Sequence, residues 1–190
     1  MNNKDLIIET TINLIEKEKL DVSQITIREI SKRCNIAVGL INYHFKSKEE
    51  LINISAERII NSIIYKFEDI KVNVAKMKPF EALDFLGNLT LDYLFDHYQI
   101  ARISILSDIS NPKIGDNTFK TYISYLPLIS KIHPEYNEEK VKIVSLKLIF
   151  FMQQIFIRND IAKEELGIDL FNKEERHKFH HAMIKEILEV

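Results

Sequence analysis

The chain has 190 residues, 46% hydrophobic and 28% charged, with a net charge of -2, so it can bury a core and is not disordered. Its four Gly and four Pro are too few for the turns of an all-β protein. One cysteine, Cys34, excludes a disulfide scaffold and a four-thiolate zinc site. Apolar runs such as residues 148–152 are far shorter than the ~20 residues of a membrane span. With no signal peptide at Met1–Asp5, we expect a soluble, cytoplasmic, mainly helical protein.

The first third of the chain predicts a long helix followed by a short one. Apolar residues at helical spacing, Ile8, Ile12 and Ile15, indicate an amphipathic helix over residues 4–19. Thr26 and Glu29 form a capping-box pattern, in which the Thr26 hydroxyl accepts from the Glu29 amide and Glu29 reaches back to the Thr26 amide. This pattern predicts a short helix over residues 27–34.

A tight turn and a second short helix are expected next. Asn35 suits the left-handed conformation that a tight helix–helix turn requires, and the small Ser31 allows two helices to cross closely. Ile36 supplies an apolar plug, and a helix follows over residues 38–44. Ser47–Glu50 is a second capping box that begins a third helix. Two short helices across such a turn form a helix-turn-helix, although any all-α protein contains similar turns.

Residues 27–51 resemble the N-terminal domain of the TetR family of bacterial transcriptional regulators. The run Tyr43-His44-Phe45, followed by Ser47-Lys48-x-x-Leu51, carries the resemblance, which extends over residues 4–55. It implies an all-α fold, with a three-helix helix-turn-helix DNA-binding domain at residues 1–50. A larger helical domain for ligand binding and dimerisation would follow at residues 51–190. The implied function is a sequence-specific regulator, a ligand-released repressor that binds a palindromic operator as a homodimer.

The resemblance also assigns candidate DNA contacts. It implies that the second short helix opens with base-reading residues and that Tyr43, His44 and Lys48 touch phosphates. A helix that opens Val-Gly-Leu can contact a thymine methyl but cannot fork onto guanine, and Asn42 can pair with adenine or bind a phosphate, so the operator sequence stays open. Basic residues are concentrated around the motif, although residues 1–66 carry a net charge of only +1, from 10 Lys and Arg against 9 Asp and Glu. The candidate set is Thr26, Arg28, Val38, Gly39, Leu40, Asn42, Tyr43, His44 and Lys48.

The remaining residues predict further helices without a flexible linker. Ile52, Ala56, Ile59, Ile63, Phe67 and Ile70 indicate one helix over residues 48–73. Helices are also expected over residues 79–97, 137–160 and 172–188. Residues 118–133 form another, which Pro127 should kink or break. Loops are expected around Pro112–Asp116 and Gly167–Asp169.

The helix over residues 137–160 is apolar on more than one face, so it needs a second packing partner. In the family that this chain resembles, the last two long helices form a four-helix bundle across a twofold axis. The alternative is a helix buried centrally in a monomer, and the pattern does not fix which face would be outward. Candidate dimer residues are Phe151, Met152, Ile155, Phe179, Met183 and Ile187.

The middle helices contain many aromatic residues with a few polar groups between them. Such a mixture suits a ligand cavity and equally an ordinary core, and the ligand inference rests on the family resemblance. Candidate ligand contacts are Phe85, Asn88, Asp92, Tyr93, Arg102, Phe119 and Tyr122. The effector, an unknown small molecule, is not identified by these residues.

We expect no enzyme, cofactor or membrane partner. Cys34 has no His at helical spacing to activate it, and the sequence has no phosphate-binding glycine loop. His177 and His181 lie four residues apart and could bind a metal with Glu174, but surface His clusters are common and we favour no metal site. The alternative function is a helical interaction or metal-binding protein that does not bind DNA.

Overall fold

The computed structural model describes residues 2–16, 22–74 and 76–190, and side chains 61–73 fall outside that description. Over these ranges the chain forms ten helices and no strand, which confirms the all-α prediction. Within the same ranges, no helix is long and apolar enough to cross a membrane.

The chain divides into two compact units. The first comprises residues 1–69 and 97–107, and the second comprises residues 70–96 and 108–190. Helix α4 (Lys48–Val74) runs from one unit into the other. The first unit is larger than the residues 1–50 expected from the sequence, because part of α4 and most of α6 (Tyr98–Ser110) belong to it.

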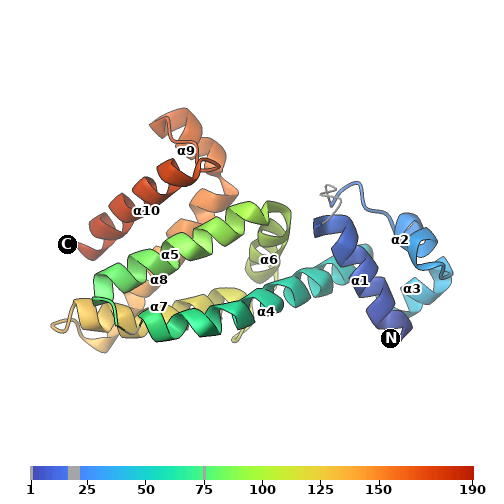
Figure 1. Cartoon of the computed structure of the whole chain (residues 1–190), viewed down its shortest axis with the longest axis horizontal. Helices are drawn as coiled ribbons and strands as arrows, with labels where there is room; N and C mark the ends of the chain where they lie inside the picture. The colour runs from blue at the N-terminus through green and yellow to red at the C-terminus, as the bar shows by residue number, and fades with distance from the viewer. Residues whose placement is uncertain (1, 17–21, 75) are drawn as a thin grey trace. The chain divides into compact units, whose positions relative to one another are not determined.

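The first unit contains the two predicted short helices, with the predicted bounds (Figure 1). Helix α1 (Asn3–Glu16) precedes α2 (Ile27–Cys34) and α3 (Val38–His44). The last residues predicted for the first helix, 17–19, lie outside the described residues. The core is built from α1 to α4 and from Ile100 of α6, and it includes Ile7, Ile30, Ile41 and Phe45.

The turn between α2 and α3 is left-handed, as predicted. Asn35 has φ 54° and ψ 44°, and its amide and that of Ile36 donate to the last carbonyls of α2. The Ser31 hydroxyl donates to the Ile36 carbonyl at 2.5 Å. At the other end of α2, Thr26 Oγ1 accepts from the Glu29 amide at 3.1 Å. The Glu29 carboxylate instead accepts from Arg33 Nε at 2.7 Å, so only the first half of the predicted capping box is confirmed.

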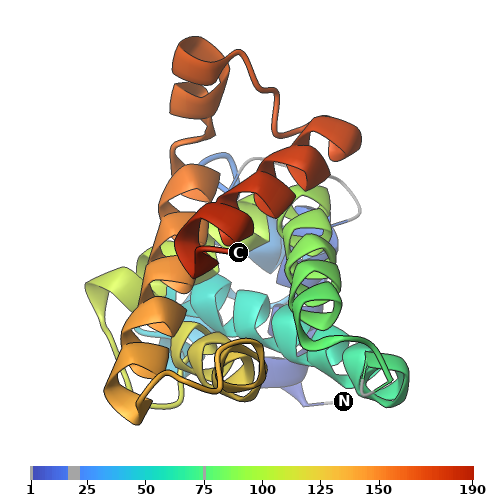
Figure 2. The same ribbon diagram turned by 90° about the vertical axis from the view of Figure 1, so that its left-hand side faces the viewer.

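The second unit is a helical bundle in which α7 (Asn117–Ile132) and α10 (Lys173–Leu188) each pack against α5 (Pro79–Asp96) and α8 (Glu138–Ile157). Figure 2 shows α10 crossing α5 and α8. Asn and Asp side chains cap three of these helices: Asp116, Asn137 and Asn172 each accept from backbone amides of the first turn.

Three details differ from the sequence prediction. Of the two effects expected of Pro127, a kink or a break, the break is wrong, because α7 continues through this exposed residue. The long helix expected over residues 137–160 ends at Ile157, and a separate α9 (Asn159–Leu166) follows Arg158. Helix α6 was not predicted, because no capping residue begins it and its apolar residues occupy several faces.

The left-handed turn generates the first testable prediction. Asn35→Val should lower the free energy of unfolding by about 1–2 kcal/mol, because a β-branched residue is strained at positive φ. Asn35→Gly is the matched control and should match or slightly exceed the wild type in stability. Urea denaturation of the three proteins measures the difference. Equal midpoints for the wild type and the valine variant would contradict the role of the turn.

Candidate nucleic-acid interface

Helix α3 presents one exposed face that contains four of the predicted DNA contacts. These contacts are two adjacent pairs, Val38 with Gly39 and Asn42 with Tyr43. The pairs are four residues apart, about one helical turn, which places them on the same side of the helix. All four are exposed, and the Tyr43 side chain retains 82% of its accessible surface. A Cβ added at Gly39 would meet no atom within 4 Å, so this part of the helix is open to a partner.

The opposite side of α3 is fixed in the core of the first unit. Ile41 and Phe45 are buried, and Leu40 and His44 are half-buried. The His44 ring contacts both the Tyr43 ring, at 5.3 Å between centroids, and the Phe45 ring. The exposed face is therefore positioned by a buried one, as a reading helix requires.

Three basic residues lie on α2 and just after α3. Arg28, Lys32 and Lys46 are exposed, and within the described part of the chain they form no ion pair. By contrast, Arg58 pairs with the acidic residues of α1, 2.9 Å from Asp5 and 3.3 Å from Glu9. Asp5 and Glu9 are thus engaged by Arg58, and Glu29 by Arg33, which leaves Arg28, Lys32 and Lys46 available on α2 and just after α3.

Lys48 has a structural contact that the sequence did not indicate, whereas the contact of Thr26 is the predicted helix cap. Lys48 Nζ donates to the Val22 carbonyl at 3.3 Å, and Thr26 Oγ1 caps α2. The second predicted capping box is present in altered form: the Glu50 amide donates to Ser47 Oγ at 3.1 Å, while the Glu50 carboxylate accepts from the Lys46 amide at 2.6 Å. These bonds fix the start of α4 beside α3.

Residues 7–53 match the model of the family described as bacterial regulatory proteins, tetR family. Residues 7–53 therefore have the N-terminal domain of the TetR family. The matched segment contains all of α2 and α3 and ends shortly after α4 begins, so it coincides with the surface described above.

Two relatives of this chain are regulators of Bacillus subtilis. It is 36% identical over 80 residues to the uncharacterized HTH-type transcriptional regulator YerO. The matched region covers 42% of this chain but only 27% of YerO. It is 24% identical over 155 residues to the probable HTH-type transcriptional regulator YttP, covering 82% of this chain and 74% of YttP. The crystal structure of Thermus thermophilus FadR, a TetR-family repressor in complex with lauroyl-CoA, has a TM-score of 0.62 at 12% identity. That likeness covers 96% of this chain and 94% of FadR and concerns the fold.

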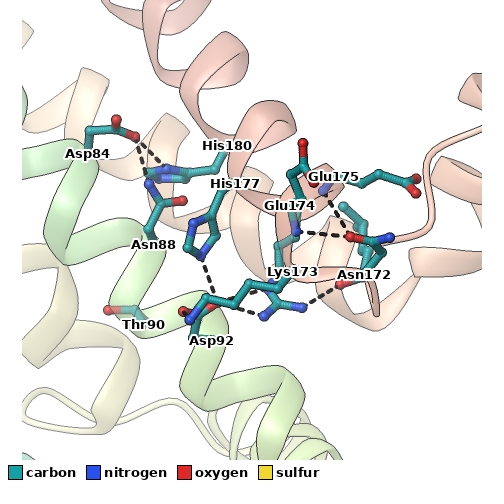
Figure 3. A network of polar contacts seen from close by, with 12 residues as sticks. Asp84, Asn88, Thr90, Asp92, Asn172, Lys173, Glu174, Glu175, His177 and His180 are labelled. Carbon is teal, nitrogen blue, oxygen red and sulfur yellow. Dashed lines mark hydrogen bonds and ion pairs between the residues drawn. The ribbon is translucent and has the colours of Figure 1, made fainter.

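The predicted ligand residues are not brought together into one site. Phe85 is exposed on α5, and Arg102 belongs to the first unit. Phe119 and Tyr122 line a groove beside α8. Tyr93 is half-buried on α5. Asn88 and Asp92, also on α5, belong instead to a polar network between α5 and α10 (Figure 3).

The centre of this network is an ion pair between Asp92 and Arg176. Asp92 Oδ1 lies 2.6 Å from Arg176 Nη2 and 2.8 Å from His177 Nε2, and Lys173 Nζ lies 2.8 Å from Asp92 Oδ2. Arg176 is only 3% exposed and also donates to the Leu170 carbonyl at 2.8 Å. Asp92 therefore serves the packing of α10 on α5 and is not available as a ligand contact.

A second carboxylate, Asp84, receives two histidines of α10. Its oxygens lie 3.0 Å from His180 Nδ1 and 2.9 Å from His181 Nδ1. His180 is buried against Gly87, where an added Cβ would come within 2.2 Å of its Nε2. The metal alternative for His177, His181 and Glu174 is thus opposed by geometry, because the two histidines contact different carboxylates and Glu174 pairs with Lys178.

The network makes the second unit sensitive to acid. Burial raises the pKa of Asp92, but hydrogen bonds from Lys173, Arg176 and His177 outweigh it and lower the pKa from 3.8 to about 2. Burial also lowers the pKa of His180, which the Asp84 carboxylate only partly offsets. Both groups bind protons more weakly when folded. The stability from Asp92 is complete above pH 3.8 and is lost as the pH falls toward 2, and that from His180 declines below pH 6.5.

The predicted dimer residues divide into two sets. Met152 and Met183 are buried in the core of the second unit, and Met152 is 4% exposed. They are therefore not surface residues in this chain. Phe151 is 43% exposed and its ring stacks on that of Phe179, with centroids 6.3 Å apart. Ile155 and Ile187 are half-buried.

The ion pair generates a stability prediction. Asp92→Asn keeps the shape of the side chain but leaves the buried Arg176 without its counter-charge. The free energy of unfolding should fall by about 3 kcal/mol near neutral pH. The difference from the wild type should shrink as the pH approaches about 2, because the wild-type carboxylate then becomes protonated.

Urea denaturation across this pH range measures the effect. Asp96→Asn, at the exposed end of the same helix, is the control and should change the stability by less than about 0.5 kcal/mol. Two variants of equal stability would show that Asp92 does not hold α10.

Proposed function

We propose that this protein is a TetR-family, sequence-specific DNA-binding transcriptional regulator, a repressor that leaves its operator when an effector binds. The observation that supports DNA binding is the exposed face of α3, held by the buried Ile41 and Phe45 and by the left-handed Asn35. Unpaired cations beside it would attract phosphates, and Val38 and Gly39 would meet base edges. We retain Thr26 and Leu40 only as neighbours of the contact surface, because the first caps α2 and the second is half-buried.

We propose that the protein acts as a homodimer on a palindromic operator. The apolar patch at Phe151 and Phe179, where α8 and α10 lie together, supports an interface on these helices. Two reading heads on one palindrome would bind far more tightly than one, through their effective concentration. The complex of the similar FadR structure with lauroyl-CoA supports the binding of an effector.

Substitutions on the α3 face test the DNA surface. Tyr43→Ala and Lys48→Ala should weaken binding to a duplex selected from a random library, and Lys48→Ala should lower the salt slope by about one unit. Tyr43→Ala should leave the thermal midpoint unchanged because the side chain is exposed. Lys48→Ala also removes the bond to the Val22 carbonyl, so its stability must be measured beside its affinity.

Fluorescence anisotropy at several salt concentrations gives both affinity and slope. Lys131→Ala, an exposed lysine of α7, is the matched control and should bind as the wild type does. Unchanged affinity and slope for both α3-side variants would remove the assignment of this face. Failure of the wild type to retain any duplex would favour a helical interaction protein.

The dimer is tested by a charge at its exposed aromatic residue. Phe151→Glu should convert a dimer to a folded monomer, because a carboxylate cannot be buried without a partner. Ile161→Glu, a similarly exposed apolar residue on α9, should remain dimeric. Sedimentation at micromolar concentration distinguishes the states. A wild type that sediments as a monomer, or a dimer that tolerates Phe151→Glu, would place the interface elsewhere or remove it.

A further inference from the structure

The second unit carries a groove of about 600 Å³ between the end of α6, residues 111–116, α7 and α8. This volume suits a small organic ligand. The walls are mainly apolar and include three aromatic rings. The wall residues that matter here are Phe119, Tyr122, Leu146, Ile149 and Phe150.

One end of the groove is polar and is built from three connected side chains. Asp108 Oδ2 accepts from both the amide and the hydroxyl of Thr118, each at 2.9 Å. The Thr118 hydroxyl in turn accepts from Gln153 Nε2 at 2.7 Å, and Gln153 is only 9% exposed. These bonds leave the Asp108 Oδ1 atom without a hydrogen-bond partner among the described residues.

Asp108 is short of positive charge. Burial raises the pKa of its carboxyl group, the Thr118 bonds lower it, and the nearby Asp116 carboxylate raises it again. Asp116 is already engaged, since it accepts from the Phe119 and Lys113 amides. Among the described residues Asp108 forms no ion pair, and Lys120 acts on it only through space. A positively charged group in the groove would stabilise the ionised carboxylate.

We propose that this groove binds an apolar aromatic cation, with its positive charge beside Asp108. The faces of Phe119, Tyr122 and Phe150 offer stacking and cation–π contacts to such a ligand. The residues that line the groove include two carboxylates, Asp108 and Asp116, and one cation, Lys113, so an anionic ligand would meet a net negative charge. Ligand binding by the groove does not depend on the proposed function, because it is measured on the protein without DNA. Only the expected consequence of binding, the release of DNA, rests on that function.

Two fluorescent probes of opposite charge test the groove. Ethidium, an aromatic cation, should bind the wild-type protein and be displaced by tetraphenylphosphonium. 8-Anilinonaphthalene-1-sulfonate, an aromatic anion, should bind more weakly at this site. Asp108→Asn should weaken ethidium by about tenfold or more and should not weaken the anion, because it removes one partly buried charge while keeping the acceptor for Thr118.

Two further variants control for charge and for shape. Asp96→Asn makes the same change in net charge outside the groove and should bind ethidium as the wild type does. Phe150→Ala should weaken ethidium through loss of an aromatic wall. The thermal midpoint of Asp108→Asn should not fall, so a loss of binding reports the site. Three results would overturn the proposal: no binding of ethidium by the wild type, tighter binding of the anion than of ethidium, or equal effects of the two Asp→Asn variants. The first result would also be seen if a second copy of the chain covered the groove.

The consequence is measured separately, with tetraphenylphosphonium added to the protein–DNA complex. Release of the duplex by the wild type but not by Asp108→Asn would support both the groove and the proposed function. Binding of the cation by a protein that never retains DNA would support the groove and overturn the proposed function. Binding without release would support the groove and remove its role as the effector site.

Discussion

The candidate DNA surface depends on two helices that are too short to be stable alone. Helices of eight and seven residues lie below the length at which isolated helices persist in water. Their shape therefore comes from the residues on their inner side and from the turn between them. The same buried Ile41 and Phe45 that stabilise α3 also decide which of its residues reach the surface. The residues that stabilise α3 and the residues proposed to contact DNA therefore lie on opposite sides of the same seven-residue helix.

The second unit adds directional polar contacts to its apolar packing. A hydrophobic contact tolerates sliding, but the bonds from Arg176 to Asp92 and to the Leu170 carbonyl are satisfied at one position of α10 along α5. His180 and His181 add a second fixed point at Asp84. Two anchors separated along the same pair of helices determine both the register and the direction of α10.

Local signals predicted local structure well and distant contacts poorly. The bounds of α2 and α3 and the caps at Thr26 and Asn172 follow from residues within a few positions of each other, and the structure reproduces them. Asp92 was named as a candidate ligand contact, and its pairing with Arg176 was not predicted, because the two residues lie 84 positions apart in the sequence. The groove shows the same limit: Phe119 and Tyr122 were singled out by composition, whereas the connection of Asp108 through Thr118 to Gln153 is visible only in three dimensions.

The close approach of Gly87 to His180 makes the residue type allowed at position 87 depend on the residue at position 180. With 2.2 Å between an added Cβ and the imidazole, a side chain at position 87 requires His180 to move or to be replaced. A smaller residue at position 180 abandons the bond to Asp84, leaving a carboxylate with one histidine in place of two. Position 87 therefore cannot gain a side chain while His180 keeps its place. Among descendants of this chain, a larger residue at position 87 should occur only where His180 has also moved or changed.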